Sequence, residues 1–134
     1  MMTLRTCKTG DAPGCDNVRK IAAFIADYAA LLSGCGATCI RIDKNTRRMT
    51  AAFGMELDIF IMPTNVNVSV WRKDSCYRET AIRKTSACGI NFNINAKLSR
   101  LSWEVADNHL DFATVLERFD RIRNLSLIHI SEPT

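Results

Sequence analysis

The sequence lacks the signatures of several common protein classes. It has six cysteines, at positions 7, 15, 35, 39, 76 and 88, but no Cys-x-x-Cys pair. Zinc sites favour such paired spacings, and the two histidines, His109 and His129, lie further along the chain. The start of the chain has no apolar segment of the secretory type, so nothing indicates an oxidising compartment. We therefore expect six reduced thiols, several of them buried as small apolar groups, and neither a metal nor another cofactor.

Long apolar runs and enzymatic motifs are also absent. The best apolar run, residues 21–32, contains Asp27 and is well short of the about twenty residues that a membrane-spanning helix needs. There is no Gly-x-Ser-x-Gly segment and no phosphate-binding Gly-Lys-Ser/Thr ending. His109 is the only candidate base, and its place in a polar stretch between two predicted helices is typical of a surface histidine. We expect no enzymatic activity and no catalytic residue.

Size and composition are those of an ordinary globular domain. With 134 residues, of which 47% are hydrophobic and 24% charged, the chain is long enough for one domain with a real core. The formal net charge of +4 permits contact with nucleic acid or anionic lipid without arguing for either.

Apolar residues at spacings of three and four predict four helices. The first covers residues 16–33 with Asp16 as its cap, and the second lies in residues 36–54 and stops at Gly54. The third and fourth lie near the end of the chain, and Asp111 caps the fourth. The expected buried faces are, in order, Val18, Ile21, Ile25, Tyr28 and Leu32; Cys39, Ile42, Thr46, Met49 and Phe53; Ile94, Leu98, Leu101 and Val105; and Phe112, Val115, Leu116, Phe119 and Ile122.

Alternation of apolar and polar residues predicts three strands between the two helix pairs. Residues 55–63 and 65–71 form a hairpin with Pro63 and Thr64 in its turn, and the more polar residues 77–85 form an edge strand. The expected fold class is therefore α+β, of order ααβββαα, with a three-stranded, mainly antiparallel sheet packed against helices. Residues 1–15 are expected to form a disordered tail.

The second predicted helix, GATCIRIDKNTRRMTAAFG, carries four basic side chains against one acid. The plainest interpretation is a structural helix with a solvated basic face, on which Asp43 and Arg47 pair. Nucleic-acid binding would require interleaved aromatic residues or a recognisable motif, and because neither is present we expect no nucleic-acid partner. A third interpretation is a surface on which Arg41 and Arg47 hold carboxylates, since the guanidinium fork matches a carboxylate. The residues alone leave the first and third interpretations open.

The order of these elements, together with two short motifs, resembles one family. Gly36-Ala37 followed by Arg41-Ile42-Asp43 is similar to the Gly-Ala-Glu-Thr-x-Arg-Val-Glu pattern of the threonine/serine exporter family, and Pro63-Thr64 stands at the first hairpin turn. Residues 18–124 resemble the soluble N-terminal domain of these membrane proteins. The family's glutamate is replaced by Thr38, so any ligand role of that acid would be lost in this chain.

The resemblance implies a longer protein. Family members, or their two-gene equivalents, carry transmembrane helices after this domain and export small amino acids or related acids by secondary transport. The implied partners are a membrane-embedded region, in cis or on a partner chain, and a small amino or carboxylic acid, with a homo-oligomer as a further option. Arg118, Arg121 and Arg123 would precede the first span, which favours the cytoplasmic side of the inner (plasma) membrane for this domain.

The last residues, LSLIHISEPT, are not typical of a domain end. They resemble translated adapter read-through, so we expect residues 125–134 to be a non-native tail, with a natural short tail as the alternative. Residues 16–124 would then be the domain proper, cut from its membrane region and soluble by itself.

Four residues are candidate substrate contacts: Arg41, Asp43, Arg47 and Thr64. We expect Arg41, Asp43 and the Thr64 turn to lie close enough to form one polar patch. The alternative function is a stand-alone α+β binding or regulatory module that presents the basic helix face.

Overall fold

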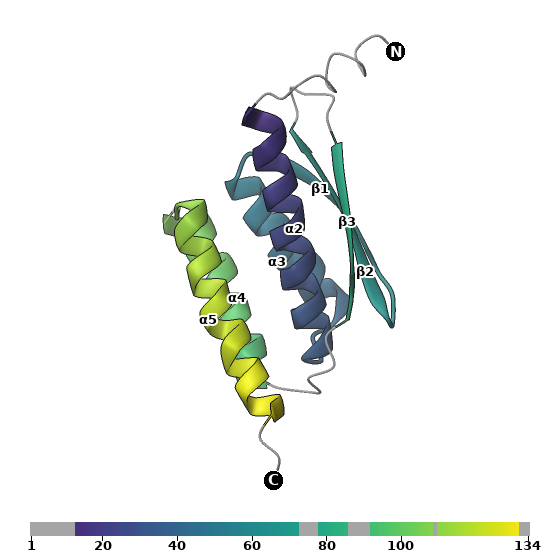
Figure 1. Cartoon of the computed structure of the whole chain (residues 1–134), viewed down its shortest axis with the longest axis vertical. Coiled ribbons are helices and arrows are strands. Elements are labelled where there is room, and N and C mark those ends of the chain that lie inside the picture. Colours follow the sequence, from purple (N-terminus) through teal and green to yellow (C-terminus); the bar gives the residue numbers. More distant parts are fainter. Residues whose placement is uncertain (1–12, 73–77, 86–91, 109, 132–134) are drawn as a thin grey trace.

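The described part of the chain folds as two helices, a three-stranded sheet and two further helices (Figure 1). The computed structural model describes residues 13–72, 78–85, 92–108 and 110–131. Its elements are α2 (Pro13–Gly34), α3 (Cys39–Ala52), β1 (Met55–Ile61), β2 (Asn65–Arg72), β3 (Arg78–Lys84), α4 (Phe92–Asn108) and α5 (Phe112–Ser131). The predicted α+β class and ααβββαα order are confirmed.

The elements form three layers, with α2 and α3 between the sheet and the α4–α5 pair (Figure 1). Helix α2 contacts β2 and β3 on one side and the outer helices on the other. A helix covered on both sides is apolar around most of its circumference. The sequence predicted a single buried face for α2, whereas Phe24, Ala26 and Leu31 are buried as well.

Helix α2 begins earlier than predicted. Its first residue is Pro13, whose fixed φ and missing amide hydrogen suit the first turn of a helix. Asp16 therefore lies inside the helix and is not its cap, and the end of the tail expected in residues 1–15 is helical. Residues 1–12 lie outside the described part of the chain. The one acid within the buried length of α2, Asp27, is half-buried and pairs with Arg83 of β3 at 2.8 Å.

Helix α3 begins later than the glycine-bounded stretch. Gly36 has a φ of 92°, and Thr38 is the N-cap, with φ −74° and ψ 158°. The Thr38 hydroxyl accepts a hydrogen bond from the amide of Arg41 at 3.2 Å. The buried stripe starts one turn into the helix, at Ile42, so Cys39 is exposed and not buried as predicted.

The sheet is antiparallel throughout, in the order β1-β2-β3. Leu57 lies opposite Val70, and Val68 of β2 lies between Ile59 of β1 and Ala81 of β3. The face that carries these side chains packs on α2 and α3, which confirms the predicted alternation in β1 and β2. β3 is a polar edge strand, as predicted.

The outer layer closes the core from the other side. Helix α4 buries its predicted stripe, and α5 buries Val115, Phe119 and Ile122. Leu116 is 37% exposed and not buried as predicted, because it lies on the outward side of an outer helix. Asp111 stands immediately before α5, and its carbonyl accepts the amide of Val115 at 3.0 Å, as expected of an N-cap residue. The backbone of α5 continues to Ser131, so the boundary placed at residue 124 stays a prediction.

Substitutions at Gly54 test whether the turn from α3 into β1 requires a left-handed backbone conformation. Its φ is +75°, and a Cβ atom added there would meet nothing within 4 Å, so a side chain costs only backbone strain. We expect Gly54→Ala to lower the free energy of unfolding by about 1 kcal/mol, and Gly54→Asn by less, because asparagine tolerates left-handed backbone. Urea titration measures both losses. Equal losses for the two variants, or none for alanine, would show that the turn does not require this conformation.

Candidate functional site

Helices α3 and α4 meet along a row of hydrogen-bonded polar side chains. Asn45 and Arg48 come from α3, Ser99 and Ser102 from α4, and Tyr28 reaches the same place from α2; we call these five residues the polar seam. The Asn45 amide donates to the Ser99 hydroxyl at 3.1 Å. Arg48 Nη1 donates to Asn45 Oδ1 at 2.9 Å and to Ser102 Oγ at 2.7 Å. Asn45, Arg48, Ser99 and Ser102 are thus paired with one another across the α3–α4 interface.

Tyr28 is the innermost member of the polar seam. Its side chain is fully buried, and its hydroxyl donates to the carbonyl of Leu98 at 2.6 Å. Burial raises the pKa of Tyr28 well above its usual range, because a phenolate at this place would lose its hydration. Hydrogen bonds from the seam and the positive charges of Arg48 and Arg41 oppose this rise only in part.

A groove borders the seam on the protein surface, formed by two adjoining pockets that share Thr38 and Arg41. The basic pocket has a volume of about 330 Å³, and its lining includes Thr38, Arg41, Lys44, Arg48, Ser99 and Trp103. The N-terminal pocket has a volume of about 340 Å³, and its lining includes Gly36, Ala37, Thr38, Arg41, Asn95 and Ala96. We call the two pockets together the α3–α4 groove.

Positive charge dominates the basic pocket. It contains Arg41, Lys44 and Arg48, and no acid is among the described residues that line it. Arg41 Nη1 donates to the neutral hydroxyl of Ser99 at 3.1 Å, and the guanidinium of Arg48 lies 3.7 Å from the ring centroid of Trp103. Within the described parts of the chain, none of the three cations has an ion-pair partner. The groove is therefore suited to an anion such as a carboxylate.

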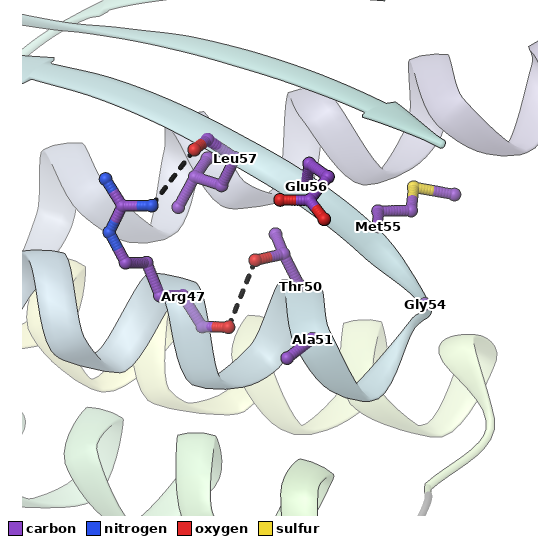
Figure 2. Close-up of a pocket in the computed structure, with 7 residues that line it drawn as sticks. All are labelled: Arg47, Thr50, Ala51, Gly54, Met55, Glu56 and Leu57. Atoms are coloured by element: carbon purple, nitrogen blue, oxygen red, sulfur yellow. Dashed lines mark hydrogen bonds between the residues drawn. The ribbon is translucent and has the colours of Figure 1, made fainter. Parts of the chain in front are cut away.

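A separate pocket, of about 360 Å³, lies between the end of α3 and the start of β1 (Figure 2). Arg47 lines it and donates to the carbonyl of Leu57 at 3.1 Å. On its other side, Arg47 Nε pairs with Asp43 at 2.8 Å, which confirms the predicted ion pair. Glu56 also lines this pocket. Because the charge of Arg47 is already matched, this pocket is less suited to a carboxylate than the α3–α4 groove.

The four candidate substrate contacts do not share one set of partners. The structure joins Asp43 to Arg47, whereas Arg41 faces α4. Thr64 lies in the turn between β1 and β2, where its carbonyl accepts the amide of Thr85 at 2.9 Å. The described contacts do not link Thr64 to Arg41 or Asp43, so a single patch of these residues stays a prediction.

Sequence reasoning missed the polar residues of α4. Asn95, Ser99 and Ser102 each follow a member of the apolar stripe by one position, so they form a second stripe at helical spacing. A polar stripe directly beside an apolar one is the signal that would have indicated a hydrogen-bonded helix contact. Asn45 and Trp103, on the two sides of the groove, were not singled out either.

The described residues offer little for metal or nucleophile chemistry. Within residues 13–72, 78–85, 92–108 and 110–131, no three His, Cys, Asp or Glu side chains gather to hold a metal ion. Cys35 is buried, as expected for several of the thiols, and Cys39 is exposed. The side chains of the other four cysteines, and His109, lie outside the described part of the chain.

Fold and groove together define the class of protein: an α+β domain that presents a positively charged groove beside a partly buried polar seam. Residues 23–129 match the model of the ThrE family, "Putative threonine/serine exporter", and the chain belongs to this family. No curated protein and no solved structure shows a significant match. Among the described helices, none has both the length and the apolar character required to cross a membrane.

The buried hydroxyl of Tyr28 predicts a stability loss at alkaline pH. Below about pH 10 both the folded and the unfolded chain keep the phenolic proton; above it only the unfolded chain releases the proton, because the folded pKa is raised. Stability should then fall by up to about 1.4 kcal/mol per pH unit for this group. We expect Tyr28→Phe to be less stable at pH 7 by about 1 kcal/mol and to decline less steeply above pH 10. Urea titrations from pH 7 to 11 compare the two proteins, and parallel declines would contradict the prediction.

Proposed function

We propose that this chain is the cytoplasmic domain of a secondary transporter that exports threonine, serine or a related small carboxylate. The observation that carries the proposal is the family match, which extends over residues 23–129 and so includes all or part of every described element from α2 to α5. In this proposal a membrane-embedded region, in the same polypeptide or on a partner chain, supplies the transport path. The complete protein resides in the inner (plasma) membrane, and no catalytic residue is assigned.

The charge of the α3–α4 groove supports a role in contacting the exported molecule. Serine, threonine and related acids each carry a carboxylate, and Arg41 and Lys44 present cations without an acidic partner among the described residues. Arg41 is the proposed carboxylate contact. Asp43 and Arg47 pair with each other on the side of α3 that meets β1, and they and Thr64 are kept as further candidate contacts.

Basic residues on α5 support the cytoplasmic orientation. Arg118, Arg121 and Arg123 lie in its middle part; Arg118 and Arg121 are exposed and Arg123 is half-buried. Each pairs with an acid: Arg118 with Glu104 at 2.9 Å, and the other two within α5 at 3.7 and 2.9 Å. Membrane orientation follows lysine and arginine near a span and gives acids little weight, so these pairs do not remove the preference.

The orientation is testable in a homologue that carries this domain and the membrane-spanning helices on one polypeptide. We expect a fluorescent reporter fused to the N-terminus to be active, and an alkaline phosphatase reporter at the same place to be inactive, because the first folds in the cytoplasm and the second requires export. Fusions at a known periplasmic loop serve as the control. The opposite result would place the domain outside the cytoplasm and overturn the orientation.

The role of the groove is testable by export from cells. In the same homologue, we expect Arg41→Gln at the matching position to reduce threonine export at least about tenfold, because a charge-assisted contact is lost. Arg100→Gln is the matched control, since Arg100 is an exposed cation of α4 outside the groove. Protein amount in the membrane is measured for both variants. Normal export by Arg41→Gln would reduce the groove to scaffold and favour the alternative of a stand-alone binding or regulatory module.

A further inference from the structure

We propose that the N-terminal pocket binds one free α-amino acid, with its carboxylate on Arg41 at the start of α3 and its ammonium on the carboxamide oxygen of Asn95. The inference rests on the proposed function for the class of ligand, and it adds a site in this chain and a role for each end of the ligand.

Asn95 provides the observation that points to a ligand. Its side chain is 9% exposed, and its Oδ1 atom makes no hydrogen bond with any described residue. The same side chain lines the N-terminal pocket. A buried acceptor without a donor destabilises the folded chain, and such groups are rare in native proteins. The oxygen itself is enclosed, so the Asn95 side chain has to turn toward the pocket for a ligand to reach it. A ligand that then brings a positively charged N–H group to this oxygen would remove the cost and gain a charge-assisted hydrogen bond.

Arg41 provides the complementary charge in the same pocket. Its described partner is the neutral hydroxyl of Ser99, reached through Nη1, so other N–H groups of the guanidinium remain for a ligand. The N-terminus of α3 adds to the positive potential, because the first amides of a helix have no acceptor within the helix. Thr38 satisfies one of these amides, that of Arg41 itself. A carboxylate fits this end of the pocket.

The size and shape of the pocket favour a small ligand. Gly36, Ala37 and Ala96 line it with little side-chain volume, and the space of about 340 Å³ is at the small end of ligand sites. Phe92, which also lines it, is 80% exposed and stands at the rim. An acceptor and a cation within one small pocket match the two charged ends of a zwitterion better than they match a simple anion, which would leave Asn95 unpaired.

Two substitutions separate binding from folding. Thr38→Asp keeps a good N-cap and suits the helix dipole, but places a negative charge beside Arg41. Asn95→Leu removes the unpaired acceptor and adds a better helix former, so a purely structural role predicts equal or higher stability and no other change. We expect both variants to be at least as stable as the wild-type chain in urea titration and to bind L-threonine at least about tenfold more weakly. Arg100→Gln is the control and should bind as the wild-type chain does.

The test is calorimetric titration of the 134-residue chain with L-threonine and L-serine. Two analogues of threonine remove one end each: 3-hydroxybutyrate lacks the ammonium, and threoninol lacks the carboxylate. We expect both analogues to bind at least about tenfold more weakly than threonine. The proposal is overturned by an absence of threonine binding, by 3-hydroxybutyrate binding as tightly as threonine, or by unchanged binding in Thr38→Asp and Asn95→Leu.

The outcome is distinct from that of the export experiment. Threonine binding with unaffected export in Arg41→Gln would leave this site standing and remove the proposed role of the groove in export. Loss of export in Arg41→Gln without threonine binding to the isolated chain would do the reverse.

Discussion

Helix α2 lies between the sheet and the α4–α5 pair, so a polar group on its covered sides must find a partner away from water. Most of its side chains are apolar and raise no such difficulty. Among the described side chains of α2 that are fully buried, Tyr28 is the polar one, and its hydroxyl is satisfied by a backbone carbonyl of α4, that of Leu98. This bond joins the middle layer to the outer one at a fixed place. The remaining polar side chains of the α3–α4 interface then gather around it, which sets where the surface groove opens.

The polar seam is not the arrangement that maximises stability. An apolar interface of the same shape avoids the desolvation of an arginine and two serines, and replacing buried polar networks with apolar residues is often neutral or stabilising. The seam instead separates two basic side chains of α3, Arg48 and Arg41, by the partners that it offers to each. Arg48 turns inward to Asn45 and Ser102, while Arg41 keeps a single described bond to Ser99 at the groove. Arg41 and Arg48 therefore both line the basic pocket, where no described acid neutralises their charge.

Much of the fold was predictable from the sequence, and the exceptions have physical causes. Period-two alternation in β1 and β2 and the apolar stripe of α4 reflect one buried face each, so pattern and structure agree. Periodicity predicted a single buried face for α2. A helix that is covered on both sides carries apolar residues around most of its circumference, so no distinct stripe marks its second buried face. Cys39 and Leu116 fit the stripes of their helices but lie where no neighbouring layer covers them. Such coverage depends on tertiary packing, which a single helix pattern does not contain.

The site was less predictable than the fold. Arg41 and the Asp43–Arg47 pair were found from charge and spacing along one helix, which are local properties. Asn45, Asn95 and Ser99 were missed because their importance comes from contacts between helices that are about fifty residues apart in sequence. A single neutral polar side chain gives no sign in the sequence of whether it meets water, a partner or an empty pocket; the signal in α4 is the stripe that several of them form together.

Geometry also indicates how the groove would respond to a ligand. A guanidinium has five N–H donors, and Arg41 uses Nη1 for Ser99, so a carboxylate can be bound without breaking the bond to the seam. Asn95 lines the pocket, and its enclosed oxygen has no described partner to give up when the side chain turns toward a ligand. The contiguous network of the seam is not by itself a switch, because coupling between sites requires two distinct arrangements. The polar seam is therefore better understood as a scaffold that fixes the position of Arg41 before a ligand binds. Such preorganisation raises affinity, because less free energy is spent on rearranging the site.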